Sequence, residues 1–322
     1  MKILMISDVY FPRVNGVSTS IQTFRQELPA LGHEVDLIAP LYPARYAEDS
    51  RTFRVPARYV PLDPEDRMMK PGAVRALLPQ LRERHYDLVH IQTPFVAHYL
   101  GIEIADALGL PRMETYHTFF EEYLFHYVPV LPRRILRGLS RRFSREQCNR
   151  MSALVVPSSA MRDKLAEYGV GVPMHVIPTG IPMAEFPPGS GAVFRARHGI
   201  GGQRPMLLYV GRVAFEKNID FLLRALEQAI AHVPELLLTI AGEGPALASL
   251  KRHVARRNLQ EHVLFVGYLD RRGALLDCYR AADAFVFASR TETQGLVLLE
   301  AMALGIPVIS TAVMGTRDIV GA

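Results

Sequence analysis

The sequence predicts an α/β protein with two doubly wound parallel sheets, and the order of its apolar segments is the evidence. Short runs of apolar and β-branched residues alternate with longer amphipathic stretches, which is typical of strand–helix–strand units on a parallel sheet. The alternation starts again after residue 200, and proline and glycine are dense over 177–192. Such a stretch indicates a linker. We therefore predict a first domain over 1–176, a linker region over 177–204 and a second domain over 205–322.

Each expected strand is a short apolar run that leads into a polar or glycine-containing loop. In the first domain we expect strands at 3–7, 35–39, 88–92, 112–116 and 153–157, and helices near 17–31, 73–84 and 97–108. In the second domain we expect strands at 206–210, 236–241, 263–267, 284–288 and 307–311. A doubly wound domain would continue with more helix and sheet after its last strand. We therefore expect the C-terminal part to be truncated.

The composition favours a cytoplasmic protein. Cys148 and Cys278 are too few for a disulfide framework or a metal cluster, which suits a reducing compartment. Asp8 ends the first apolar run before a signal-peptide core could form, and no run of about 18 uncharged apolar residues occurs. The net charge of +5 permits anionic substrates, acidic lipid surfaces or nucleic acid.

The loop after the strand at 206–210 carries two cations. Open α/β sheets bind ligands at the carboxyl ends of their strands, and two such domains leave a cleft between them. Gly211 and Arg212 lead here to Lys217, just before an expected helix. Two cations at a helix N-terminus could neutralise a diphosphate without metal, and the sequence has no Asp-x-Asp. The alternative is that both cations are simply solvated.

Three further glycines and one histidine stand beside expected strand ends. Gly16 is either an ordinary tight turn or lets the backbone approach an anion at a helix N-terminus. Gly242 and Gly267 are each ordinary turn residues, but both stand at the end of an expected strand. His117 follows the strand at 112–116, where a structural and a catalytic role are equally compatible with the sequence.

Two glutamates flank the start of a strongly apolar segment at 291–305. Glu292 precedes the expected helix, and Glu300 lies within it. Because this helix is apolar nearly all round, it should be buried. A buried carboxylate needs a partner, which could be protein or ligand.

These motifs together resemble one family. The chain resembles the retaining glycosyltransferases of the GT-B fold known as glycosyl transferases group one, and the likeness covers almost the whole sequence. It is carried by the glutamate pair, EAMALGIPV at 300–308, the loop from Gly211 to Lys217, GEGP at 242–245 and NGVST at 15–19. The glutamate-pair segment is the most specific part.

The resemblance implies a role for each candidate residue. Glu292 would contact hydroxyls of the donor sugar, and Glu300 would hold the ribose. The implied catalytic residues are His117, Glu292, Arg212 and Lys217. The implied donor-binding residues are Gly16, Gly211, Arg212, Lys217, Gly242, Gly267, Gly295, Leu296 and Glu300.

A narrower likeness concerns the acceptor. TYHTFFEEY at 115–123 and TETQG at 291–295 are similar to segments of enzymes that add glucose to diacylglycerol, and of relatives that mannosylate lipids. This implies that a hexose passes with retention from a donor of the UDP-glucose or GDP-mannose type to a lipid hydroxyl, with no cofactor and no metal. A soluble or polysaccharide acceptor is the alternative. A nucleotide-sugar epimerase of the same fold and a non-catalytic binding module are the rival classes.

The segment 132–150 carries seven arginines against the single acid Glu146. As a helix it would gather Ile135, Leu136, Leu139 and Phe143 in one sector, with most arginines opposite. This helix is either an ordinary domain helix or a surface that docks on the anionic inner face of the cell membrane. Nucleic acid is not an expected partner, because no basic patch with interleaved aromatics matches a known module.

Overall fold

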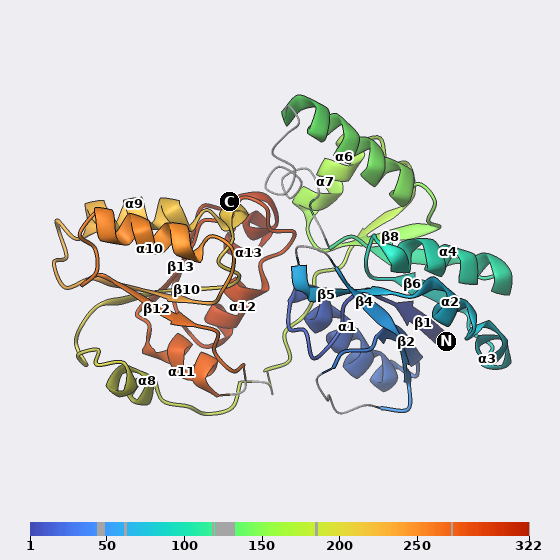
Figure 1. The fold of residues 1–322 in the computed structure, drawn as a ribbon, viewed down its shortest axis with the longest axis horizontal. Coiled ribbons are helices and arrows are strands. Elements are labelled where there is room, and N and C mark those ends of the chain that lie inside the picture. Colours follow the sequence, from blue (N-terminus) through green and yellow to red (C-terminus); the bar gives the residue numbers. More distant parts are fainter. Residues whose placement is uncertain are drawn as a thin grey trace. The chain divides into compact units, whose positions relative to one another are not determined.

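The computed structural model of the protein describes residues 1–43, 49–60, 63–117, 119, 133–183, 186–271 and 273–321. The chain divides into two compact units, one with the described residues up to Gly180 and one with those from Ile181 onward. Each unit is built on its own parallel sheet (Figure 1). The predicted fold class, two α/β units with doubly wound parallel sheets, is therefore confirmed.

The first unit contains a seven-stranded sheet in the order β3-β2-β1-β6-β7-β8-β9. Its strands are β1 (Lys2–Ile6), β2 (Glu34–Pro40), β3 (Thr52–Val55), β6 (Leu88–Ile91), β7 (Arg112–Thr115), β8 (Ala153–Val156) and β9 (Met174–Val176). All neighbours pair in parallel. Chain order reverses between β1 and β6, which makes the carboxyl ends of these two strands the place where such a sheet binds ligands.

The helices of the first unit are α1 (Gly16–Glu27), α2 (Pro71–Arg75), α3 (Leu78–Glu83), α4 (Val96–Leu108), α6 (Arg133–Cys148) and α7 (Ser159–Glu167). Prolines stand in the first turns of α2 and α3, and Ser158 caps α7. Asn15 caps α1 by accepting a hydrogen bond from the Ser18 amide at 2.9 Å. The single helix predicted near 73–84 is two helices, because Pro79 has no amide hydrogen to continue the first one.

Several features of the first unit were not predicted. They include β3 and β9, the two edge strands of the sheet, and the helix α7. They also include an antiparallel pair, β4 (Ala57–Val60) and β5 (Asp63–Met69). The acidic and proline residues of β5 do not read as a strand, so pairing with β4 rather than intrinsic preference accounts for it.

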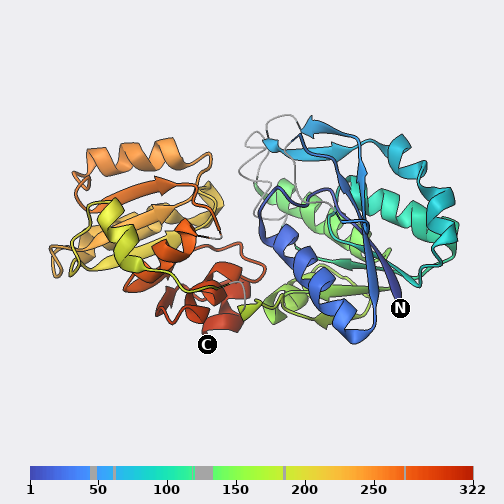
Figure 2. The ribbon, with the colours of Figure 1, turned by 90° about the horizontal axis from the view of Figure 1, so that it is seen from below.

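The second unit contains a five-stranded parallel sheet in the order β12-β11-β10-β13-β14. The strands are β10 (Met206–Val210), β11 (Leu237–Ala241), β12 (Val263–Gly267), β13 (Ala284–Phe287) and β14 (Val308–Ser310). Its α-helices are α8 (Gly191–Arg197), α9 (Ile219–Ala229), α10 (Leu247–Arg256), α11 (Ala274–Ala281), α12 (Leu296–Ala303) and α13 (Arg317–Val320). Helices α9 and α10 cover one face, and α11 and α12 lie on the other (Figures 1 and 2). Chain order reverses between β10 and β13.

The core of the second unit is aromatic where the two central strands meet. Tyr209 of β10 stacks with Phe287 of β13 at 5.8 Å, and Phe285 stacks with Tyr279 of α11 at the same distance. Tyr209, Tyr279 and Phe285 are fully buried. This rigid centre holds the loops that leave the carboxyl ends of β10 and β13.

Candidate functional site

The loops after β10 and β13 bring two predicted site residues into contact. Lys217 ends the short 3-10 helix Phe215–Lys217, and Glu292 lies in the loop between β13 and α12. The Lys217 Nζ lies 2.5 Å from Glu292 Oε1, although 75 residues separate them. Their side chains are 22% and 16% exposed, so both can still be reached from solvent. The pair stands at the switch point of the sheet, where α/β domains bind ligands.

Asn218 fixes the position of Lys217 and was not recognised from the sequence. It adopts a left-handed conformation with φ 55° and is the residue before α9. Its Nδ2 donates to the Ala288 carbonyl at 3.1 Å, which ties the loop after β10 to the end of β13. An asparagine just before a helix was the available signal, because this residue type tolerates left-handed backbone.

Main-chain hydrogen bonds join the loops after β10, β11 and β12. The Gly211 amide donates to the Ala241 carbonyl at 3.1 Å, and the Gly242 amide donates to the Gly267 carbonyl at 2.8 Å. A Cβ on Gly242 would lie 1.9 Å from the Gly211 oxygen, so only glycine allows this approach. The structure therefore brings Gly211, Gly242 and Gly267 together at one edge of the sheet.

Arg212 lies in the same loop as Lys217 and is half-buried. Its carbonyl accepts a hydrogen bond from the Tyr209 hydroxyl at 3.0 Å and another from the Ala214 amide at 3.0 Å. The loop is thus fixed from both sides. The two cations that the sequence placed in this loop are held on an ordered backbone.

The main chain of the loop that carries Glu292 is held by contacts with Gly315. The Gly315 amide donates to the Glu292 carbonyl at 2.9 Å. A Cβ on Gly315 would lie 2.1 Å from the Thr293 carbonyl oxygen, so this contact requires glycine. Gly295 follows with φ 99°, and α12 begins at the next residue, Leu296. The first residue of α12 therefore lies four positions beyond Glu292.

Glu300 is buried in α12 and has protein partners for both oxygens. Arg271 Nη2 lies 2.5 Å from Oε1, and the Tyr279 hydroxyl donates to Oε2 at 3.0 Å. Burial, and then the charge of Glu300, raises the pKa of Tyr279 well above its usual range. Each carboxylate oxygen has a second lone pair, so this arrangement does not prevent Glu300 from accepting further hydrogen bonds. Arg271 was not identified from the sequence, since nothing in the spacing connects it to Glu300.

The burial predicted for α12 is only partly found. Leu298, Glu300 and Ala301 are buried, whereas Met302 is 41% exposed. A helix on one face of a sheet has an outer side, and Met302 lies there.

In the first unit, Gly16 and His117 lie on the side of the sheet where the carboxyl ends of the strands lie. Gly16 is the exposed first residue of α1, and His117 follows β7 by two residues. His117 Nε2 lies 3.1 Å from Gln92 Oε1, just after β6. Burial lowers the pKa of His117 to about 4, so the ring is neutral at pH 7. Thr118 and residues 120–123 of the TYHTFFEEY segment lie outside the described residues.

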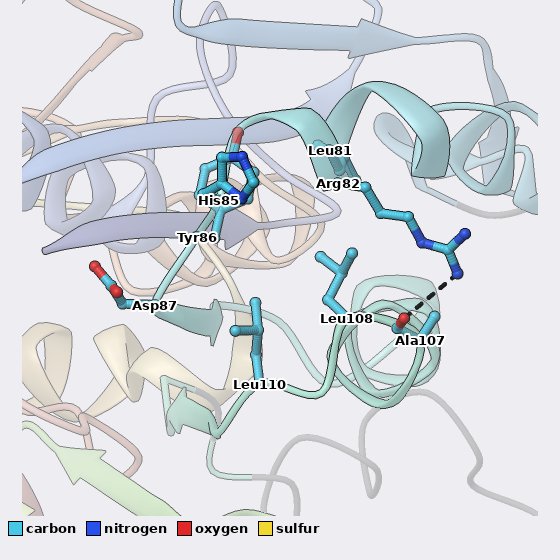
Figure 3. A pocket seen from close by; sticks show the side chains of 8 residues that line it. All are labelled: Leu81, Arg82, His85, Tyr86, Asp87, Ala107, Leu108 and Leu110. Atoms are coloured by element: carbon cyan, nitrogen blue, oxygen red, sulfur yellow. Dashed lines mark hydrogen bonds between the residues drawn. The ribbon is translucent and has the colours of Figure 1, made fainter.

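A pocket of about 440 Å³ lies elsewhere in the first unit (Figure 3). Asp87 precedes β6 and Leu110 precedes β7, so the pocket is at the amino ends of the strands. Arg82 reaches across it toward the Ala107 carbonyl at 3.5 Å. Sheets of this kind bind ligands at the opposite edge, so we do not assign the candidate site to this pocket.

Two family profiles match the chain. The one described as Glycosyltransferase Family 4 matches residues 14–185, and the one described as Glycosyl transferases group 1 matches residues 192–322. The chain is 35% identical over 325 residues to an alpha-monoglucosyldiacylglycerol synthase of Streptococcus pneumoniae, a match that covers 96% of this chain and 71% of that protein. It is 28% identical to a GDP-mannose-dependent alpha-mannosyltransferase of Mycolicibacterium smegmatis, covering 99% and 82%.

Solved structures show the same fold. A sucrose-phosphate synthase from Thermosynechococcus elongatus superimposes with a TM-score of 0.76 at 24% identity, covering 98% of this chain and 82% of that one. At this level of sequence identity, the similarity supports a shared fold and nothing further.

Proposed function

Because the chain belongs to the glycosyl transferases group 1 family, we propose that it moves a hexose from a nucleotide-diphosphate sugar to a hydroxyl of a membrane lipid such as diacylglycerol. The donor would be of the UDP-glucose or GDP-mannose type. The observation that carries this proposal is the 35% identity, over nearly the whole chain, to a relative named for the glucosylation of diacylglycerol. The similarity to a mannosyltransferase keeps both donor types in the proposal.

The contact between Lys217 and Glu292 supports the assignment of the donor site. A sugar nucleotide carries its sugar hydroxyls and its diphosphate on either side of the bond that breaks. A carboxylate suits hydroxyls, and an ammonium suits phosphate oxygens. The two groups lie 2.5 Å apart, so one ligand can contact both. We assign Glu292 to the sugar, Lys217 and Arg212 to the diphosphate, and Glu300 to the ribose.

The proposed reaction proceeds with retention and without metal. The leaving phosphate would help to deprotonate the acceptor hydroxyl on the same face of the sugar. The chain would mainly stabilise the charge that grows on the diphosphate, through Arg212, Lys217 and the amides at Gly295 and Leu296. Such preorganised donors can contribute roughly 3–4 kcal/mol each. Gly16 and His117 would act from the first unit, His117 near the reacting centre.

Helix α6 supports a membrane as the source of the acceptor. Its buried residues are Leu136, Ser140, Ser144, Gln147 and Cys148. Ile135 and Leu139, which the sequence placed in one sector with Leu136, are instead 51% and 54% exposed. Exposed apolar residues among arginines are typical of helices that lie in a membrane interface. Pro132 and the Arg133 side chain lie outside the described residues.

The arginines of α6 give that surface its charge. Arg134, Arg137, Arg141, Arg142 and Arg145 are exposed, against one exposed acid, Glu146. Within the described part of the chain, every helix is too short or too polar to span a bilayer. We propose that the protein docks by α6 on the anionic inner face of the cell membrane, from the cytoplasm.

Turnover of a panel of donors with a panel of acceptors tests the proposed function. We expect the full chain to release nucleoside diphosphate only when diacylglycerol vesicles are present, and to form an α-linked glycolipid. Release of nucleoside diphosphate with a soluble glycan but not with lipid would show that the acceptor is a soluble glycan. Conversion of the donor without any acceptor would indicate an epimerase, and ligand binding without turnover would indicate a binding module.

A further inference from the structure

Tyr279 connects the aromatic core of the second unit to Glu300. It lies on α11, its ring stacks with Phe285 of β13 at 5.8 Å, and its side chain is fully buried. Its hydroxyl donates to Glu300 Oε2 at 3.0 Å. A ring packed in the core has little freedom, so its hydroxyl can hold the carboxylate in one orientation.

The chemistry of the two groups determines the direction of this hydrogen bond. Burial, and then the charge of Glu300, raises the pKa of Tyr279 well above its usual range, so the hydroxyl keeps its proton at pH 7. A carboxylate that is paired with Arg271 can only accept. The Val297 carbonyl is another acceptor near the hydroxyl, but it is neutral and lies at 3.4 Å. The charged and nearer oxygen of Glu300 is the stronger acceptor.

The second partner of Glu300 differs from Tyr279 in its exposure. Arg271 contacts Oε1, and its side chain is 30% exposed, against 6% for the side chain of Glu300. A ligand that reaches Glu300 from solvent can therefore also touch Arg271, whereas it cannot touch the buried Tyr279. Any effect of the Tyr279 hydroxyl on ribose binding must pass through Glu300.

We propose that Tyr279 is a positioning residue that holds the Glu300 carboxylate in the orientation in which it accepts hydrogen bonds from the ribose hydroxyls of the donor. This inference rests on the proposed function, in which Glu300 holds the ribose. An unheld glutamate side chain would lose its rotational freedom when the nucleotide binds. Because Tyr279 already holds the carboxylate, binding does not carry that cost.

Tyr279→Phe removes the hydroxyl and keeps the ring, so it tests this role. The probes are UDP and GDP, each compared with its 2′,3′-dideoxy counterpart, which lacks both ribose hydroxyls. We expect the wild type to bind its ribonucleotide at least about tenfold more tightly than the dideoxy form, as for hydrogen bonds to a charged group. In Tyr279→Phe this preference should fall below about threefold, with little change in affinity for the dideoxy form. Calorimetry measures all the dissociation constants.

Two results of this comparison would overturn the proposal. One is a Tyr279→Phe variant that keeps the wild-type preference for ribose. The other is an equal loss of affinity for both forms of the nucleotide, which would indicate a role in the fold alone. Tyr209→Phe is the matched control, because Tyr209 is also fully buried and its hydroxyl donates to the Arg212 carbonyl at 3.0 Å. Its effect should be the same on both forms, so the preference should not change.

A double-mutant cycle tests whether Tyr279 acts through Glu300. Tyr279→Phe combined with Glu300→Ala should show the same preference for ribose as Glu300→Ala alone, because no carboxylate is left to position. A further loss of preference in the double variant would overturn the proposal.

¹³C NMR of the wild type gives a test that does not depend on the stability of a variant. The signal of the ring carbon Cζ of Tyr279 reports on the hydrogen bond of its hydroxyl. The ribonucleotide adds hydrogen bonds to the same carboxylate, so it should shift this signal more than the dideoxy form does. Equal shifts with the two forms, or no shift with either, would overturn the proposal.

Glu300→Ala separates this inference from the proposed function. If the wild type binds the ribonucleotide and its dideoxy form equally, Glu300 does not hold the ribose and the site assignment fails. If Glu300→Ala loses the preference while Tyr279→Phe keeps it, the site stands and the role of Tyr279 is refuted.

Discussion

The ammonium of Lys217 and the carboxylate of Glu292 form an ion pair between the loop after β10 and the loop after β13. The lysine offers three donors and this contact uses one of them. Lys217 can therefore hold Glu292 and a phosphate oxygen at the same time. The pair also neutralises Glu292, which reduces repulsion between that carboxylate and an incoming diphosphate.

We predict that the two glutamates of the site have separable roles. Glu292→Gln should lower turnover about tenfold or more while nucleoside diphosphate still binds, because the sugar contact lies beyond the nucleotide. Glu300→Ala should weaken binding of the nucleotide itself. Calorimetry with UDP and GDP, together with kinetics, measures both effects. Glu235→Gln, on an exposed residue, is the control.

Equal losses of nucleotide affinity in the two variants would contradict this division. Glu300→Ala also removes the acceptor of Arg271 and Tyr279, so its melting temperature should fall. Glu300→Gln keeps an acceptor for one of them and should fold more stably. If nucleotide affinity falls in both Glu300 variants, the loss therefore comes from a missing contact in the site and not from a less stable fold.

A second prediction is that the reaction needs the two cations and no metal ion. Turnover should survive a chelator, and Lys217→Met or Arg212→Ala should lower it about 100-fold, since each cation would stabilise the charge on the leaving diphosphate. Lys251→Met, on the exposed side of α10, should have no effect. If chelation abolished turnover and added magnesium restored it, the cations would not be the phosphate clamp.

The sequence predicted the central parallel strands well because they are largely buried and read as continuous apolar runs, whereas the edge strands β3 and β9 are mostly only partly buried or exposed and were missed. MLLYV and LLLTIA are of this kind, and they form β10 and β11. The loop residues after these strands were predicted for the same reason, since the end of a strand locates its loop. The pair Lys217–Glu292 follows from the topology, which places β10 beside β13.

Partners across loops could not be predicted. Arg271 reaches Glu300 only because the chain after β12 folds toward α12, and no periodic pattern encodes that path. The bond between Gln92 and His117 likewise depends on the spacing of β6 and β7. The exposed position of Ile135 and Leu139 was missed because a helical projection gives the angle between residues but not which side meets the sheet.

A third prediction concerns acid stability of the contact between α9 and α10. Hydrogen bonds from Arg257 and then His253 lower the pKa of Glu227 from 4.5 to about 2. A carboxyl with a depressed folded pKa stabilises the protein above its unfolded pKa and loses that contribution as pH falls through the folded one. The melting temperature of the wild type should therefore approach that of Glu227→Gln between pH 4.5 and about 2. A constant difference over this range would contradict the prediction.

The last prediction concerns docking of α6 on an anionic membrane. Each arginine near such a surface contributes about 1 kcal/mol, so Arg134→Glu with Arg137→Glu should weaken binding to vesicles at least tenfold. Both of these side chains are exposed. Binding of the wild type should also fall with salt, because the attraction is screened over roughly 8–10 Å.

The matched control reverses two exposed arginines of α10, Arg252→Glu with Arg256→Glu, which changes the net charge equally. It should bind as the wild type does if α6 is the docking surface. Ile135→Ser with Leu139→Ser tests the apolar contribution separately and should weaken binding even at low salt, where the arginines act fully. Co-sedimentation with vesicles of graded anionic content measures all four proteins. Equal binding to neutral and anionic vesicles, or equal losses in the α6 and α10 variants, would make α6 an ordinary surface helix and favour a soluble acceptor.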